Sequence, residues 1–174
     1  MTNISLVQGD ITSADVDAIV NAANSRMLGG GGVDGAIHRA AGRALLEACK
    51  QVKPVNGIRC PVAEARITPA GQLKARYVIH TVGPRYRIDS HPQEFLRNAY
   101  RNSLQLALEN SCKSIAFPAI SCGVYGYPMD EAAEIALGES SKEEYQTLSI
   151  SFFLFSQSDL DVWRSVHESL QRLK

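Results

Sequence analysis

Two glycine-rich loops carry the side chains of this sequence whose types and spacing could do chemistry. The first spans residues 21–34 and holds four consecutive glycines. The carboxamides of Asn21 and Asn24 precede the glycines, and the carboxylate of Asp34 follows them. Because glycine has no Cβ, the backbone can adopt positive φ there and its N–H groups can converge on an anion. A second loop of the same character spans residues 121–126, and two such loops fit the two phosphates of a nucleotide diphosphate.

Asp34 is the first candidate for catalysis. A carboxylate beside such a loop can reach a bound water and act as a general base or anchor a ligand. Alternatively, it only complements the positive end of a helix dipole. His38 lies one turn later on the same helical face, a spacing that suits either a proton-transfer pair or a simple ion pair. No group of His, Cys and acidic residues has the spacing of a zinc site, so no metal is predicted.

Four other polar or aromatic residues stand where strands end or in the second loop. Asp10 could accept hydrogen bonds from a ligand amine, or it could cap the turn that follows it. Cys122 could be a nucleophile, but the lack of a nearby His in sequence disfavours this. Tyr125 could stack on a sugar or a base. Phe155 is expected to be a core residue, or a stacking platform for a base if it faces the site.

The elements that must position these residues alternate between strands and helices. Short apolar runs predict strands at residues 4–8, 18–21, 65–68, 77–82, 114–117 and 149–155. Apolar residues repeating at three and four positions predict helices at 34–50, 92–110 and 158–173, with a further helix from Asp130 that Gly138 interrupts. This order predicts an α/β fold with helices on both faces of a mostly parallel sheet. Ligands then bind at the carboxyl ends of the strands, where both loops lie.

The composition limits the class of protein. Lys and Arg together number 18, as do Asp and Glu, so a broad basic surface for nucleic acid is not predicted. No apolar run reaches the roughly 18 residues of a membrane helix, and no signal peptide is recognised. The four cysteines lack CxxC spacing and are expected to be reduced thiols. We therefore expect one cytoplasmic domain over residues 1–174, with no membrane partner.

Two common nucleotide motifs are not supported. Gly30, Gly32 and Gly35 match the G-x-G-x-x-G pattern, but the first glycine lies well beyond the strand end. About twenty positions later, where an acidic residue should close a second strand, the sequence around Pro54 is still typical of a loop. A hydride-transfer enzyme is therefore not predicted. The P-loop pattern is absent from the sequence.

Five segments closely resemble the macrodomain family, in particular its MacroD-type branch. They are GDIT at 9–12, IVNAAN at 19–24, GGGGVDGAIHRAAG at 29–42, YVIHTVGP at 77–84 and FPAISCGVYGYP at 117–128. The enzymes of this branch remove acetate from O-acetyl-ADP-ribose and ADP-ribose from protein carboxylates. The resemblance implies a three-layer α/β/α sandwich on a six-stranded mixed sheet, ADP-ribose as ligand and no cofactor. The sequence departs from the family pattern after Cys60-Pro61, where members of the family commonly have Thr-Gly and this chain has Val62-Ala63.

By motif position, the resemblance also implies roles for individual residues. Asp10 would bind the adenine amino group with Ile11 beside it, and Phe155 would lie against adenine. Asn21 and Asn24 would be polar contacts of the ligand, with Asn24 on the distal ribose. That ribose and its phosphate would be lined by Gly31, Gly32, Val33 and Asp34. The pyrophosphate would be wrapped by the backbone of Ser121, Cys122, Gly123, Val124, Tyr125 and Gly126, with the Tyr125 ring on the distal ribose.

The implied reaction uses Asn24 and Asp34. A water near the phosphates would attack an ester on the distal ribose or its anomeric carbon, Asp34 would activate or orient the water, and Asn24 would hold the ribose. Either Asp34 or a substrate phosphate would take the proton. The substrates would be O-acetyl-ADP-ribose and ADP-ribosylated proteins. Two alternatives remain: a non-catalytic reader of ADP-ribose, and a regulator of a ribonuclease through protein contact.

Overall fold

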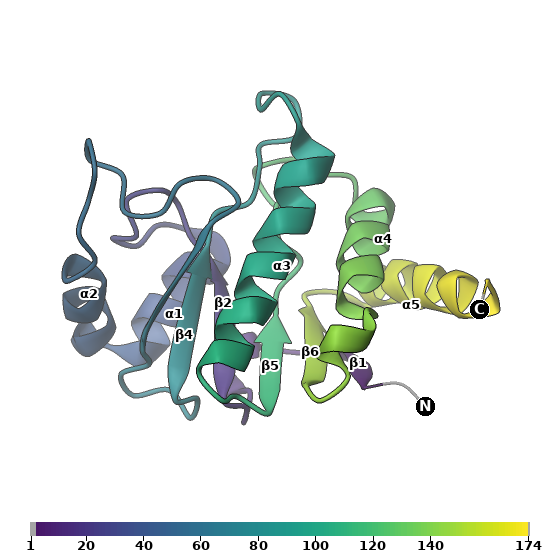
Figure 1. The fold of residues 1–174 in the computed structure, drawn as a ribbon, viewed down its shortest axis with the longest axis horizontal. Coiled ribbons are helices and arrows are strands. Elements are labelled where there is room, and N and C mark those ends of the chain that lie inside the picture. Colours follow the sequence, from purple (N-terminus) through teal and green to yellow (C-terminus); the bar gives the residue numbers. More distant parts are fainter. Residues whose placement is uncertain (1–2, 174) are drawn as a thin grey trace.

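A six-stranded sheet forms the centre of the structure, a computed structural model that describes residues 3–173 (Figure 1). The strands are β1 (Ile4–Gln8), β2 (Ala18–Ala22), β3 (Ala65–Pro69), β4 (Tyr77–Thr81), β5 (Ser114–Phe117) and β6 (Ser149–Leu154). Their order in the sheet is β1-β6-β5-β2-β4-β3. Only the edge pair β3–β4 is antiparallel among these strands. The prediction of a mixed, mostly parallel sheet is confirmed.

Helices cover both faces of the sheet. The α-helices are α1 (Gly32–Ala41), α2 (Arg43–Lys50), α3 (Pro92–Glu109), α4 (Met129–Ser140) and α5 (Gln157–Arg172), and short 3-10 turns lie at Ile11–Ser13 and Glu143–Tyr145. Successive residues of a strand point to opposite faces. Val20 accordingly packs in the cluster that α3, α4 and α5 share, and Ile19 packs with α1 and α2. Figure 1 shows α3 and α4 in front of the sheet and α1 behind it. This is the predicted α/β/α sandwich.

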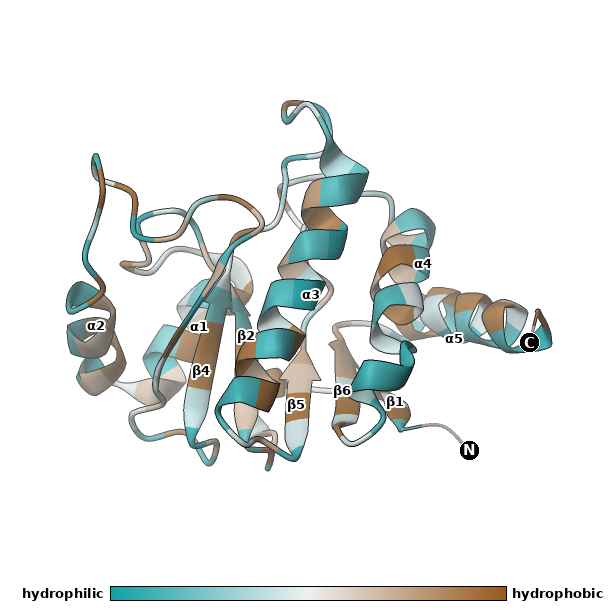
Figure 2. Cartoon of the chain, in the orientation of Figure 1, coloured by the Kyte–Doolittle hydropathy of each residue, from teal (hydrophilic) through white to brown (hydrophobic). Residues whose placement is uncertain are grey.

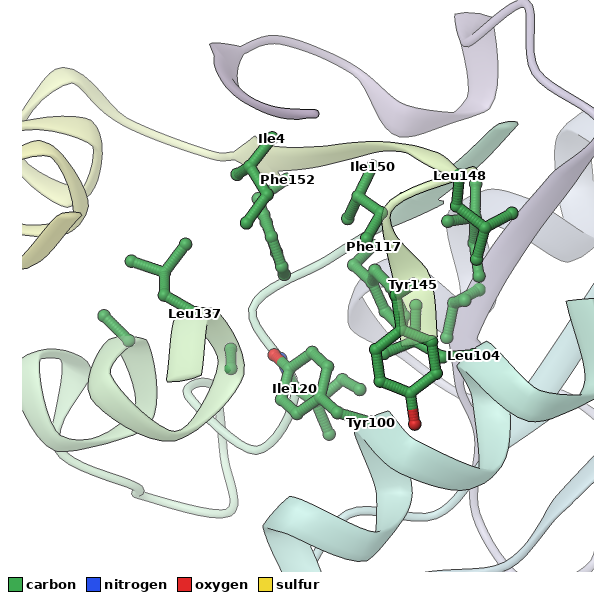
Figure 3. Close-up of a cluster of buried hydrophobic side chains, with 14 of the residues drawn as sticks. Ile4, Tyr100, Leu104, Phe117, Ile120, Leu137, Tyr145, Leu148, Ile150 and Phe152 are labelled. Atoms are coloured by element: carbon green, nitrogen blue, oxygen red, sulfur yellow. The ribbon is translucent and has the colours of Figure 1, made fainter. Parts of the chain in front are cut away.

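An aromatic cluster fills the face under α3, α4 and α5 (Figure 3). The Phe117 ring lies 5.1 Å from that of Tyr100 and stacks on Phe152 at 5.4 Å, and Phe152 lies 5.0 Å from Trp163. All four side chains are fully buried. The Tyr100 hydroxyl donates to Pro118 O and accepts from Ile120 N, so the core holds the chain segment that leads into the second glycine loop.

The hydropathy of the helices agrees with their packing against the sheet. Figure 2 shows hydrophobic and hydrophilic residues alternating around α3 and α5, as expected for helices with one face on the core. Within residues 3–173, no helix has the length and hydropathy needed to cross a bilayer.

Two predicted helix features are wrong. The helix expected over residues 34–50 is two helices, because Gly42 adopts a φ of 82° between α1 and α2 and its N–H closes α1 on His38 O. Gly138 does not interrupt α4, which continues to Ser140. Burial of Ala136 and Leu137 outweighs the helix-propensity cost of a glycine, which is about 1 kcal/mol.

The departure from the family pattern at Ala63 has a visible consequence. Ala63 adopts a φ of 72°, the left-handed region where glycine is normally preferred. Its N–H donates to Val82 O at 2.8 Å, and its carbonyl accepts from Asn102 Nδ2 at 2.7 Å. These contacts hold the turn despite the side chain.

Candidate functional site

The sheet brings the two glycine loops together. The first loop follows β2 and the second follows β5. Because these strands are parallel neighbours, both loops begin at the same end of the sheet, where the carboxyl ends of these strands lie. The segment after β4 holds the second loop: Ser121 Oγ donates to Pro84 O at 2.7 Å, and Tyr86 N donates to Tyr125 O at 2.9 Å. Gly83 allows this approach, because a Cβ there would clash with Ile120 and Ser121.

Asp10 and Phe155 lie side by side at the same end of the sheet as the two loops. Asp10 follows β1 after Gly9, and Phe155 directly follows β6, the parallel neighbour of β1. Gly9 N donates to Leu154 O at 3.2 Å. Phe155 is 93% exposed and is therefore not a core residue. Asp10 caps the turn after it, since one carboxylate oxygen accepts from Thr12 N and from the Thr12 hydroxyl. These hydrogen bonds lower the pKa of Asp10 below its ordinary value.

The first glycine loop packs tightly against α1. A Cβ on Gly35 would lie 2.5 Å from Gly30 O, so only glycine permits this contact. Gly29 and Gly32 have φ values of 94° and 58°. The N-cap residue Gly31 offers no side chain to the first turn of α1. The N–H groups at this helix end are thus available to an anion, and the helix dipole favours one.

Asp34 is a buried carboxylate held on one oxygen. Its Oδ1 accepts from Asn21 Nδ2 at 2.8 Å and lies 3.5 Å from His38 Nε2. Burial raises the pKa of Asp34 above its ordinary value, while the hydrogen bond from Asn21 and the charge of His38 oppose that rise. A raised pKa makes the carboxylate a stronger base than an exposed Asp.

Asn24 shapes its own loop and also faces Asp34. Its Nδ2 donates to Gly29 O at 3.1 Å, and its Oδ1 accepts from the N–H groups of Arg26 and Met27. A Cβ built on Gly30 would lie 3.3 Å from Asn24 Nδ2 and 3.1 Å from Asp34 Oδ2. The amide and the free carboxylate oxygen therefore converge beside Gly30, close enough to contact one bound group.

The second glycine loop offers backbone donors. Gly126 N donates to Gly123 O and Tyr127 N to Ser121 O, which closes a tight turn in which Ser121 has a φ of 68°. No hydrogen bond from the N–H groups of residues 123–125 is found within the described chain. Val124, at the tip, is 99% exposed. Such free N–H groups can bind a pyrophosphate without Lys or Arg.

The Cys122 thiol is poorly suited to act as a nucleophile. Burial, and secondarily the charge of Asp159, raises its pKa to about 12. The thiolate, which is the reactive form, is therefore scarce at neutral pH. All four cysteines are free thiols, and no cluster of potential metal ligands occurs among residues 3–173.

His80 is a component of the site that the sequence analysis missed. It pairs with Asn21 in the β2–β4 register, and its Nδ1 lies 3.3 Å from Asn21 Nδ2. Its Nε2 lies 3.0 Å from Thr68 Oγ1. The only sequence signal is a polar residue inside the apolar strand YVIHT, where a side chain must find buried partners.

The family comparison agrees with this geometry. A profile described as Macro domain matches residues 20–136, more than half of the chain. The chain belongs to the macro domain family. This confirms the resemblance that the loop motifs indicated.

Close relatives of this macrodomain carry mixed names. A macro domain-containing protein of Vibrio parahaemolyticus is 63% identical over 164 residues, which are 94% of this chain and 96% of that protein. A protein of Salmonella newport named O-acetyl-ADP-ribose deacetylase is 60% identical over 137 residues, 78% of this chain and 76% of that protein.

Solved macrodomain structures share the fold. The Oceanobacillus iheyensis macrodomain with ADP superposes with a TM-score of 0.92 at 44% identity, covering 97% of this chain and 92% of that one. The Trypanosoma brucei macrodomain in complex with ADP-ribose has a TM-score of 0.83 at 45% identity, covering 94% and 68%.

Proposed function

We propose that this macrodomain binds ADP-ribose and hydrolyses bonds at its distal ribose. It would deacetylate O-acetyl-ADP-ribose and remove mono-ADP-ribose from acidic side chains of proteins. The observation that carries the proposal is the convergence of Asp34 Oδ2 and Asn24 Nδ2 beside Gly30. The Salmonella relative's name and the ligand in the Trypanosoma structure support it.

The order of strands supports one orientation of ADP-ribose. Adenine would lie between Asp10, Ile11 and Phe155, after β1 and β6. The pyrophosphate would follow at the loop after β5, and the distal ribose at the loop after β2, with the Tyr125 ring packed on it. Asn21, Gly31, Gly32 and Val33 would complete the binding site together with Ser121, Cys122, Gly123, Val124 and Gly126. Oriented N–H groups would hold the two negative charges.

The chemistry of deacetylation needs one positioned water. Its oxygen would attack the acyl carbon, the bond from that carbon to the ribose oxygen would break, the ribose oxygen would take up a proton to become a hydroxyl, and acetate and ADP-ribose would leave. Asp34 Oδ2 would orient the water, and either Asp34 or a substrate phosphate would take the proton of the water. Asn24 would hold the ribose in place. Help from a general base is typically worth about 10²–10⁴ in rate.

The competing functions need fewer of these features. A reader of ADP-ribose would need both loops but not a buried carboxylate facing Asn24. A regulator of a ribonuclease would need a partner surface, and no feature among residues 3–173 marks one. Because the formal net charge is zero, we do not expect direct binding of nucleic acid. Our proposal of a hydrolase includes action in the cytoplasm on ADP-ribosylated proteins.

A kinetic comparison tests the proposal. Release of acetate from O-acetyl-ADP-ribose and of ADP-ribose from a glutamate-modified protein would be measured for the native chain, Asn24→Ala and Asp34→Ala. Calorimetry would give the ADP-ribose affinity of each. We expect kcat to fall by about 10²–10⁴ in Asp34→Ala while ADP-ribose still binds. Tight binding by a native chain that hydrolyses neither substrate would identify a reader.

A further inference from the structure

We propose that His80 is a positioning residue for this hydrolysis: it holds the Asn21 amide so that Asn21 anchors Asp34 by one oxygen and leaves the other for the reaction. The inference rests on the proposed function. It concerns a fully buried side chain, one residue before the end of β4, whose ring lies between Asn21 and Thr68.

The hydrogen-bond directions follow from the charge of Asp34. An ionised carboxylate only accepts, so the Asn21 group 2.8 Å from Asp34 Oδ1 must be the NH₂. The same nitrogen lies 3.3 Å from His80 Nδ1, which must therefore be the acceptor. A neutral imidazole with an accepting Nδ1 carries its proton on Nε2. That proton is donated to Thr68 Oγ1, 3.0 Å away.

Burial keeps His80 in this neutral form. The side chain is fully buried between β2 and β3, and desolvation, with a smaller effect from the charge of His38, lowers its pKa to about 3. The Cys49 thiol, 3.7 Å from Nε2, is the other polar group at this end of the ring. Imidazole is thus a fixed, uncharged hydrogen-bonding group at physiological pH.

Within residues 3–173, no other side chain is found to hydrogen-bond the Asn21 amide. Its Oδ1 is buried and accepts no hydrogen bond among the described residues. The amide is therefore oriented from its nitrogen side alone, by Asp34 in front and by His80 behind. Losing His80 would leave the amide free to tilt, and Asp34 Oδ1 would lose its fixed donor. Asp34 Oδ2, beside Gly30, would then no longer be aimed at one point.

Three variants separate positioning from folding. His80→Leu removes the acceptor behind Asn21. His80→Asn can place an amide oxygen near the former Nδ1 and restore it. Thr68→Val keeps the shape of the far partner but removes its oxygen. For His80→Leu we expect kcat on O-acetyl-ADP-ribose to fall about tenfold to hundredfold with KM within about twofold, since small misplacement of a reacting group has effects of that size. His80→Asn should recover most of the loss, and Thr68→Val should show a smaller fall.

The pH profile gives a second readout. The groups that face Asp34 are Asn21 from β2, Asn24 from the first glycine loop, His38 from its own helix and the Cys49 thiol from α2. Because donation from Asn21 lowers the pKa of Asp34, His80→Leu should move the acidic limb of kcat/KM to higher pH. His80→Leu and His80→Asn should differ in this limb, which a general loss of stability would not produce.

Nitrogen-15 NMR of the histidine rings tests the geometry without turnover. We expect an unprotonated Nδ1 and a protonated Nε2 for His80 in the native chain. Protonation at Nδ1, or equal kinetics of His80→Leu and the native chain, would overturn the positioning role. If His80→Leu fails to fold, the kinetics of Thr68→Val and the ring signals of the native chain still test the positioning role of His80. A native chain with the expected ring signals but no hydrolysis would instead refute the proposed function itself, and the positioning role with it.

Discussion

Gly30 sets the space between the two candidate catalytic side chains. A Cβ at this position would lie within 3.3 Å of both Asn24 Nδ2 and Asp34 Oδ2. Its φ lies outside the left-handed region, so alanine is compatible with the backbone. The absence of a side chain at residue 30 thus serves the site and not the turn.

Gly30→Ala is therefore expected to damage activity more than stability. The added methyl would push Asn24 and Asp34 apart by a few tenths of an ångström and occupy space that a ligand would use. We expect kcat/KM on O-acetyl-ADP-ribose to fall about tenfold to hundredfold. Gly138→Ala, the same change in α4, is the matched control and should retain native activity. Equal activity of Gly30→Ala and the native chain would contradict the assigned geometry.

His80 should make stability depend on pH. Its pKa is about 3 in the fold against an ordinary value of 6.5, so the unfolded chain binds the proton more tightly. Stability from this group is present above about pH 6.5 and is lost as the pH falls toward 3. We expect a loss of about 2 kcal/mol between pH 7 and pH 5 in denaturant titrations. His80→Asn, which does not titrate, should lack that part of the slope, and equal slopes would show that His80 is not buried and neutral.

At the scale of elements, glycines act in different ways in different helices. Gly42 ends α1 with a φ of 82°, whereas Gly138 lies inside α4 with ordinary helical geometry. A Cβ on Gly138 would meet no atom within 4 Å. Gly35, in contrast, must stay glycine because the glycine loop crosses it closely.

Gly138→Ala is expected to stabilise the protein. Alanine loses less backbone entropy in a helix, a gain of about 0.5–1 kcal/mol. Urea unfolding at constant m value would measure it. A decrease in stability would mean that the surroundings of Gly138 are more crowded than this structure indicates.

At the scale of the whole molecule, both helical layers pack on one sheet. The two buried clusters lie on opposite faces of the same strands, since Ile19 and Val20 are neighbours in β2. The single domain over residues 1–174 remains a prediction.

Thermal unfolding tests that prediction and ligand binding together. We expect one cooperative transition, because neither layer has a core without the sheet. If ADP-ribose binds the folded chain, a concentration one hundred times its Kd should add about 2.7 kcal/mol of stability. Inorganic phosphate at the same concentration controls for general ionic effects. Two separate transitions would refute the single domain, and an unchanged Tm with ADP-ribose would argue against the binding site.

The sequence alone determined the elements and the identity of the loops. Short apolar runs placed the ends of every strand within one residue. Glycines marked both loops, and carboxamide and carboxylate groups beside them marked the first, because these signals depend on neighbours in the chain. The break at Gly42 was missed, since a glycine between two apolar stripes also fits a continuous helix.

Only the tertiary structure decided which distant residues meet. Asp10 and Phe155 are brought together by the pairing of β1 with β6, and Asn21, His80 and Thr68 by the register of β2, β4 and β3. The surroundings of His80 and the raised pKa of Asp34 depend on burial among these strands. Strand order and register place hydrogen-bonding groups across long sequence separations, and local patterns carry no information about them.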